Sequence, residues 1–134
     1  DQQIELQENQ SISSIFENQG EAYFRKVEAE MLRSIPKHEK AVIALGGGTP
    51  CFYNNMDYIN DVGTTVYLKR SESRILGRLR QNKQMRPLVA HLSDSELKLF
   101  IAESLGQRAP FYEKAQLIFD ADNAKIAELE EMLN

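Results

Sequence analysis

The chain has 134 residues, of which 16 are basic and 20 acidic, and a formal net charge of −4. A chain of this length builds one hydrophobic core, which predicts a single domain over residues 1–134. Its mildly acidic balance argues against general nucleic-acid binding, which needs a basic face, and favours small-molecule partners.

The first element with a clear pattern is a helix over residues 24–35, where apolar residues recur at helical spacing and end before Pro36. This helix places Arg25 and Glu28 one turn apart. Glu28 is therefore a candidate to orient Arg25, with an exposed helix charge as the alternative interpretation.

An apolar run over residues 41–45 predicts a buried strand that leads into Gly46, Gly47 and Gly48. Glycines leave the backbone amides uncovered by side chains and tolerate positive φ. Because ligands of α/β proteins commonly bind where a strand ends, the triple glycine is a candidate binding turn. A plain connection between elements is the alternative.

Further along the chain, strands are predicted at 64–68 and 116–119 from their β-branched and aromatic residues. Ser71 is expected to cap a helix that runs through about Gln81, and Ser93 with Glu96 has the capping-box pattern of another helix. A polar loop, residues 83–92, separates these two helices. Residues 126–133 close the chain with an amphipathic pattern. Strands alternating with helices predict a three-layer α/β/α domain around a parallel sheet whose strands are buried on both faces.

Four segments and the triple glycine together carry a family resemblance. The segments are Asp1–Glu5, residues 16–28 with Phe16 and Gly20 to Glu28, Arg86-Pro87-Leu88, and Gln107–Tyr112. In order and spacing they resemble the shikimate kinases, which move the γ-phosphoryl group of ATP onto the 3-hydroxyl of shikimate in aromatic amino acid (chorismate) biosynthesis. The resemblance covers essentially the whole chain.

The resemblance implies the P-loop kinase architecture, similar to that of the nucleoside monophosphate kinases. Yet no Gly-x-x-x-x-Gly-Lys-[Ser/Thr] run, the loop that holds nucleotide phosphates, occurs in the sequence. The chain also lacks an initiator Met and begins at Asp1, which resembles the second aspartate of the family's Asp-x-Asp pair. We therefore expect the first strand and the phosphate loop to lie upstream, and this chain alone to fold poorly and to be inactive.

The resemblance also assigns the shikimate site. It implies that Arg25 and Arg108 bind the carboxylate, a task suited to the planar guanidinium fork. Asp1 resembles the residue that accepts a hydrogen bond from the reacting hydroxyl and takes its proton. The glycines Gly46, Gly47 and Gly48 are expected to line the pocket. Phe16 and Phe24 resemble pocket-wall aromatics, with simple core packing as the alternative.

On the nucleotide side, Arg86 resembles the lid arginine that closes over the phosphates, which makes residues 83–92 a candidate lid. Arg78 or Arg80 is expected to stack on the adenine, with Arg78 favoured. Mg²⁺ is expected with ATP, but its usual ligands lie upstream of residue 1, so no metal ligand is assigned in this chain. His38 and His91 lack the spacing of metal ligands.

The location implied by the sequence is the cytoplasm. Cys51 is the only cysteine, which suits a reducing compartment, and no signal peptide or apolar run of roughly 20 residues is present. No membrane or nucleic-acid partner is expected, and the resemblance implies a monomer. Two other interpretations stay open: a related small-molecule kinase such as a gluconate kinase, and a non-catalytic shikimate-binding remnant.

Overall fold

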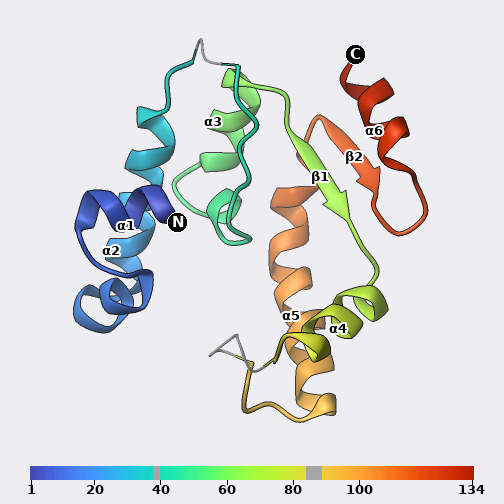
Figure 1. Ribbon diagram of the computed structural model, residues 1–134, viewed down its shortest axis with the longest axis horizontal. Coiled ribbons are helices and arrows are strands. Elements are labelled where there is room, and N and C mark those ends of the chain that lie inside the picture. Colours follow the sequence, from blue (N-terminus) through green and yellow to red (C-terminus); the bar gives the residue numbers. More distant parts are fainter. Residues whose placement is uncertain (38–39, 84–88) are drawn as a thin grey trace. The chain divides into compact units, whose positions relative to one another are not determined.

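The structure, a computed structural model, describes residues 1–37, 40–83 and 89–134 (Figure 1). By its internal contacts the chain divides into two compact units, Asp1–Thr64 and Thr65–Asn134, and each is described by itself. The single domain over residues 1–134 stays a prediction. No described helix is both long enough and apolar enough to cross a membrane.

The first unit is mainly helical. Helix α1 spans Gln2–Glu8 and helix α2 spans Ile12–Ser34. Ser11 caps α2 because its side chain accepts a hydrogen bond from the Ser14 amide at 3.1 Å. The predicted end of this helix before Pro36 is confirmed, whereas α2 begins well before residue 24 and α1 was not predicted. The start of α2 is not marked by apolar periodicity, because polar residues around Gly20 interrupt that pattern.

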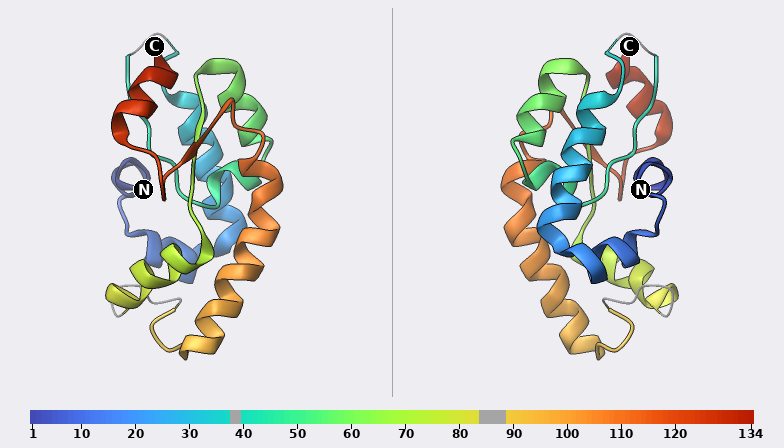
Figure 2. Two further views of the ribbon diagram at one scale, coloured as in Figure 1. Left: turned by 90° about the vertical axis from the view of Figure 1, so that its right-hand side faces the viewer. Right: turned by 90° about the vertical axis from the view of Figure 1, so that its left-hand side faces the viewer.

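Gly20 breaks α2 into two halves. Its φ of 82° and ψ of 171° are not helical, and Figure 2 shows the two halves meeting at an angle. This region of backbone space is open almost only to glycine. The break lets the first half turn back, so that Ile15 and Phe24 enter the same buried cluster with Ile4 and Val27.

We expect Gly20→Ala to destabilise the protein by about 1–3 kcal/mol, because a Cβ is strained at this φ although nothing lies within 4 Å of it. Gly106→Ala is the matched control: Gly106 lies inside a helix, also with free space around it. There alanine should stabilise by about 0.5–1 kcal/mol. Urea unfolding measures the change in the free energy of unfolding for each variant, which should be a loss for Gly20→Ala and a gain for Gly106→Ala. Equal changes would show that the backbone at position 20 does not require glycine.

The strand predicted at 41–45 does not form. The segment is coil, and Val42 is 104% exposed and Ile43 49% exposed. A strand needs a neighbour to receive its backbone hydrogen bonds, and none of the described residues pairs with this segment. The segment leads through the glycines into the short 3-10 helix η1, Thr49–Cys51, and then helix α3, Asn55–Val62.

The second unit contains a two-stranded parallel sheet (Figure 1). Strand β1 spans Val66–Lys69 and β2 spans Leu117–Asp120, with Val66 opposite Leu117 and Lys69 opposite Asp120. The two strands predicted here are confirmed. The burial on both faces that was predicted for the strand at 64–68 is wrong, because Leu68 is 57% exposed. In β2, Ile118 is 45% exposed.

Three helices complete the second unit: α4, Glu72–Gln81, α5, Asp94–Tyr112, and α6, Ile126–Leu133. All three were predicted. Helix α5 begins with the expected capping box, in which Ser93 Oγ accepts from the Glu96 amide at 3.3 Å and Glu96 Oε2 from the Ser93 amide at 2.6 Å. The Ser93 amide holds the pKa of Glu96 below its ordinary value. Between α4 and α5 lies a small core of Leu76, Val89, Leu97 and Ile101.

Candidate functional site

The triple glycine forms a tight turn beside α2. The Thr49 amide donates to the Gly46 carbonyl at 3.1 Å, and the Cys51 amide to the Gly48 carbonyl at 3.0 Å. Gly48 has a φ of −86°, and among the described glycines only Gly20 has a positive φ. The positive φ that glycine tolerates is therefore not used in this turn, and Gly48 serves instead to leave space.

That space is filled by Arg25. A Cβ built on Gly48 would lie 2.7 Å from Cζ of Arg25 and closer still to Nη2, a separation that real side chains do not adopt. The guanidinium thus stands directly against the backbone of the turn. Any larger residue at position 48 has to displace this guanidinium, which is the far end of a flexible side chain, so the turn keeps its backbone only if Arg25 moves.

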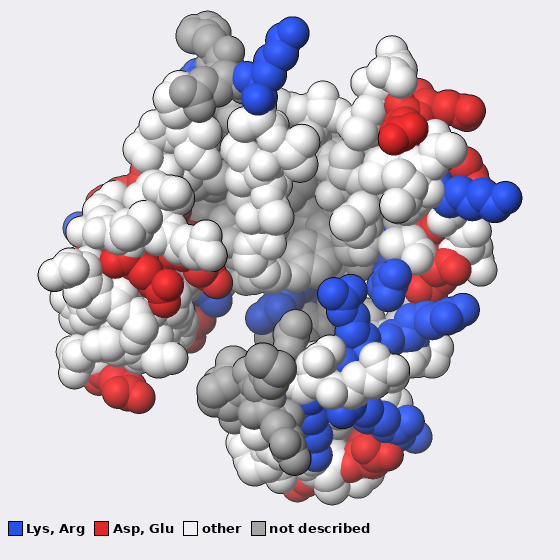
Figure 3. Space-filling view, viewed as in Figure 1, with Lys and Arg blue, Asp and Glu red and all other residues white. Residues whose placement is uncertain are grey.

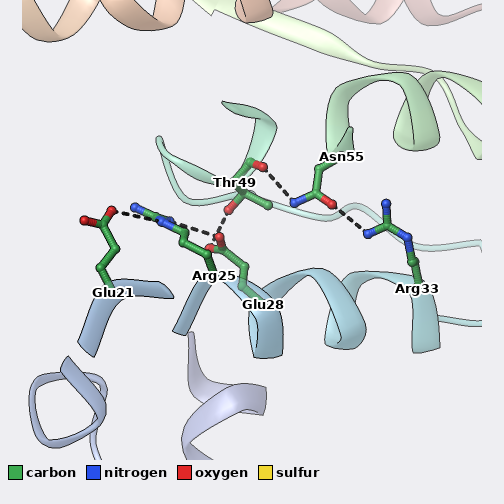
Figure 4. A network of polar contacts seen from close by, with 6 residues as sticks. All are labelled: Glu21, Arg25, Glu28, Arg33, Thr49 and Asn55. Carbon is green, nitrogen blue, oxygen red and sulfur yellow. Dashed lines mark hydrogen bonds and ion pairs between the residues drawn. The ribbon is translucent and has the colours of Figure 1, made fainter. Parts of the chain in front are cut away.

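Carboxylates and aromatic rings hold the Arg25 side chain, which is 13% exposed. Nη1 donates to Glu28 Oε1 at 2.9 Å and Nε to Glu21 Oε1 at 3.3 Å (Figure 4). The guanidinium carbon lies 4.5 Å from the ring centre of Phe52 and 5.2 Å from that of Phe24, distances at which cation–π attraction operates. Arg25 is consequently held in one orientation before any ligand binds.

Glu28 is the buried member of this pair, at 6% exposure. Its Oε1 accepts from Arg25, and its Oε2 accepts from Thr49 Oγ1 at 2.7 Å. A buried carboxylate needs such partners to offset its desolvation. The burial excludes the interpretation of Glu28 as an exposed helix charge, and its contacts make it the residue that orients Arg25.

Sequence reasoning missed two further members of this network, Arg33 and Asn55 (Figure 4). Arg33 Nη1 donates to Asn55 Oδ1 at 2.7 Å, and Asn55 Nδ2 donates to the Thr49 carbonyl at 2.9 Å. One signal was present, because Arg33 follows Arg25 by eight positions and so lies on the same face of α2. Asn55 gave no signal, since its partners are distant in sequence.

The two phenylalanines lie together. The ring centres of Phe16 and Phe24 are 4.8 Å apart, but Phe24 is 4% exposed and belongs to the buried cluster, whereas Phe16 is 37% exposed. Phe24 therefore packs in the core and also contacts Arg25. A contact of either ring with a ligand stays a prediction.

The second unit carries the other candidate residues. Arg108 lies near the end of α5, is partly buried, and forms no ion pair within the described part of the chain. Because Arg25 belongs to the first unit and Arg108 to the second, each is placed only within its own unit. Their convergence on one carboxylate stays a prediction.

Basic side chains gather over α4, at the lower centre of Figure 3. Arg80 is engaged there: its Nε and Nη2 lie 3.2 and 2.5 Å from the two carboxylate oxygens of Asp94. Arg78 is exposed and has no acceptor among the described residues. Of the two arginines considered for the adenine, Arg80 is thus paired with Asp94, whereas Arg78 has no ion-pair partner in residues 1–37, 40–83 and 89–134.

Polar side chains gather at the carboxyl ends of β1 and β2, where ligands of parallel sheets commonly bind. Asp122 Oδ2 accepts a hydrogen bond from the Ser71 amide at 2.9 Å. Hydrogen bonding with Ser71, first with its side chain and then with its amide, lowers the pKa of Asp122. Hydrogen bonds from Asn123, first from its side chain, and from the Asp122 amide lower the pKa of Asp120. Both carboxylates are therefore ionised at neutral pH and order the loop after β2.

A comparison with protein-family models identifies the family to which this chain belongs. The family model described as shikimate kinase matches residues 1–134. The chain belongs to the shikimate kinase family.

Curated relatives agree. Shikimate kinase of Phocaeicola vulgatus is 45% identical over 119 residues, which cover 89% of this chain and 68% of the relative. Shikimate kinase of Parabacteroides distasonis is 45% identical over 122 residues, covering 91% of this chain and 70% of the relative. The chain thus spans about two thirds of the length of these shikimate kinases.

Solved structures show the fold. A crystal structure of shikimate kinase from Bacteroides thetaiotaomicron superposes with a TM-score of 0.90 at 40% identity, over 99% of this chain and 80% of that one. Shikimate kinase from Acinetobacter baumannii in complex with shikimate gives 0.79 at 27% identity, over 99% and 73%. The fold is therefore that of the shikimate kinases, P-loop kinases with a parallel sheet, as predicted.

The remaining residues predicted from the shikimate kinase resemblance are placed as follows. Asp1 is exposed and begins α1, with no capping hydrogen bond from its side chain. Arg86 lies outside the described residues, as do its neighbours over 84–88 in the predicted lid. No group of three His, Cys, Asp or Glu side chains within residues 1–37, 40–83 and 89–134 is arranged to hold a metal ion. His38 also lies outside these ranges.

Proposed function

We propose that the protein transfers the γ-phosphoryl group of ATP to the 3-hydroxyl of shikimate, giving shikimate 3-phosphate and ADP in aromatic amino acid (chorismate) biosynthesis. The observation that carries this proposal is the Arg25 guanidinium, fixed by Glu28 and Phe52 against the Gly48 backbone. A preorganised guanidinium beside an open glycine turn suits the carboxylate of a small acid. Family membership supplies the reaction class.

In this proposal Arg25 and Arg108 are the residues that bind the carboxylate of shikimate, and Gly46, Gly47 and Gly48 line the pocket. A prearranged cation needs no reorganisation when the anion arrives, so more of the interaction free energy appears as affinity. The relative solved with shikimate supports the ligand class. Phe16 and Phe24 contribute apolar walls, Phe24 chiefly by supporting Arg25.

The chemical step in this proposal uses residues of both units. Asp1 accepts a hydrogen bond from the reacting hydroxyl, orients its oxygen toward the γ-phosphorus and takes its proton. Arg86 neutralises charge that develops on the transferring group, and Arg78 stacks on the adenine. We assign Mg²⁺ no ligand in this chain and derive no step through it.

We expect Arg108→Ala in the full-length gene product to raise the shikimate KM roughly 30-fold or more, because truncating one partner of a hydrogen-bonded charge pair costs about 2–5 kcal/mol. The KM for ATP should stay nearly unchanged, since the substitution removes only the carboxylate contact. A coupled assay of ADP release with shikimate and ATP measures both constants.

Lys98→Ala is the matched control, because Lys98 is an exposed cation on the same helix. It should leave both KM values unchanged. An unaltered shikimate KM in Arg108→Ala would remove Arg108 from the site while leaving the proposed reaction intact. Absence of shikimate-dependent ADP release from the wild-type protein would contradict the reaction itself. Shikimate binding without turnover would indicate the binding remnant, and turnover with gluconate the related kinase.

A further inference from the structure

A continuous chain of hydrogen bonds runs from the end of α2 to Arg25 (Figure 4). Arg33 Nη1 donates to Asn55 Oδ1 at 2.7 Å, and Asn55 Nδ2 donates to the Thr49 carbonyl at 2.9 Å. Thr49 Oγ1 then donates to Glu28 Oε2 at 2.7 Å, and Glu28 Oε1 accepts from Arg25. The turn that faces Arg25 is thereby tied to α2 at two points.

Asn55 is the central link, and it is fully buried at 0% exposure. Its amide orientation follows from its partners. Arg33 can only donate, so the oxygen of Asn55 must face it, and the Thr49 carbonyl can only accept, so the nitrogen must face that. No rotation of the amide satisfies both partners in another way. An aspartate of the same shape would direct a carboxylate oxygen at the Thr49 carbonyl.

Arg33 also holds a strained turn. Tyr53 and Asn54 are consecutive non-glycine residues in the left-handed region, with φ of 50° and 52°, which costs about 1–2 kcal/mol for tyrosine and less for asparagine. Arg33 Nη2 donates to the Tyr53 carbonyl at 2.8 Å, and its Nη1 also donates to the Ala29 carbonyl at 3.0 Å. Such strain persists where surrounding contacts over-determine the backbone, and it clusters at functional sites.

The strained turn has a second connection with the site. It directly follows Phe52, whose ring centre lies 4.5 Å from the guanidinium carbon of Arg25. Arg33 therefore acts on Arg25 by two routes, through Asn55 and Thr49 to Glu28, and through Tyr53 to Phe52. Neither Arg33 nor Asn55 contacts Arg25 itself.

We propose that Arg33 and Asn55 are positioning residues for the carboxylate-binding arginine, holding the glycine turn and Phe52 in the places that fix the Arg25 guanidinium. This role rests on the proposed function. A displacement of about 1 Å at a substrate-positioning group can cost 10²-fold in rate. A hydrogen-bond network remote from the ligand can therefore have a measurable effect on the KM for shikimate.

The test uses Asn55→Asp and Arg33→Lys in the full-length gene product. Lysine keeps the charge of Arg33 but cannot donate in the fork geometry that serves three acceptors. Each variant should raise the shikimate KM roughly 10- to 100-fold and leave the ATP KM unchanged. Lys26→Ala, which removes an exposed α2 cation paired with Glu30 at 3.9 Å, is the control and should change neither KM.

A double-mutant cycle separates positioning from a merely structural role. If Asn55 acts through Arg25, Asn55→Asp should have little further effect on the shikimate KM in an Arg25→Lys background. If the two substitutions instead multiply their effects on the shikimate KM, the proposal is overturned. A lower kcat and melting temperature with an unchanged shikimate KM in both variants would also overturn it. If Asn55→Asp fails to fold, the same comparison is made with Arg33→Lys in the Arg25→Lys background, and its result decides between the two roles. A wild-type protein without shikimate-dependent turnover overturns the proposed function and this role with it, whereas normal wild-type turnover with unaffected variants overturns this role alone.

Discussion

Gly48→Ala should weaken shikimate binding by roughly 100-fold or more, because the new Cβ would lie 2.7 Å from Cζ of Arg25 and push the guanidinium from its site. The backbone itself suits alanine, since φ is −86°. The stability change should therefore stay within the roughly 1–3 kcal/mol of an overpacked contact. Titration calorimetry with shikimate measures the affinity, and thermal unfolding measures the stability.

Gly77→Ala serves as the control for this substitution. Gly77 lies within α4, and nothing lies within 4 Å of the position that its new methyl group would take. Alanine there should leave shikimate affinity unchanged and stabilise the helix by about 0.5–1 kcal/mol. Retention of wild-type affinity by Gly48→Ala would mean that the guanidinium can shift without loss. Arg25 would then not be the preorganised carboxylate grip that we propose.

Glu28→Gln should destabilise the protein by about 3–5 kcal/mol, the usual cost of leaving one member of a buried ion pair without its partner. The side chains of Glu28 and Arg25 are 7% and 13% exposed, so solvent screens their interaction little. Glutamine has nearly the same size, which excludes a cavity as the cause. We expect the Tm to fall by roughly 10 °C or more, and shikimate affinity to fall with it because Arg25 loses its orientation.

Glu30→Gln is the matched control on the same helix. Glu30 is 61% exposed and lies 3.9 Å from Lys26, and exposed pairs of this kind contribute at most about 1 kcal/mol. Its Tm should change little. Similar Tm values for the two variants would show that the Glu28 charge does not stabilise this fold, and the account of Arg25 orientation would have to be abandoned.

Local signals predicted several helix ends, although helices α1 and α3 were not predicted. The Ser93–Glu96 box marks the start of α5 and Pro36 the end of α2, because capping and proline geometry depend on only a few neighbouring residues. Ser71 precedes α4 as predicted, but the expected cap is absent because its side chain makes no capping hydrogen bond. The start of α2 could not be predicted in the same way. Gly20 interrupts its apolar pattern, and whether a glycine ends or bends a helix depends on what packs against the two halves.

Features that depend on distant partners were harder to predict. The run at 41–45 has strand composition but forms no strand, because pairing requires a neighbour that local sequence does not specify. The bond between Arg33 and Asn55 joins residues 22 positions apart. The triple glycine was predicted to line the site, which stays a prediction, and the reason for glycine at position 48, room for a guanidinium, is visible only in three dimensions.

The parallel pairing of β1 with β2 has a consequence for the order of folding events in the second unit. The bond from the Gln116 amide to Thr65 Oγ1, beside the two strands, closes a loop of 51 positions, and the entropy cost of closing a loop rises with its length. Helices α4 and α5 meet through a much shorter connection and bury Leu76 against Leu97. We therefore expect the two helices to associate first and the strands to pair later, when the helical hairpin has already brought them closer together.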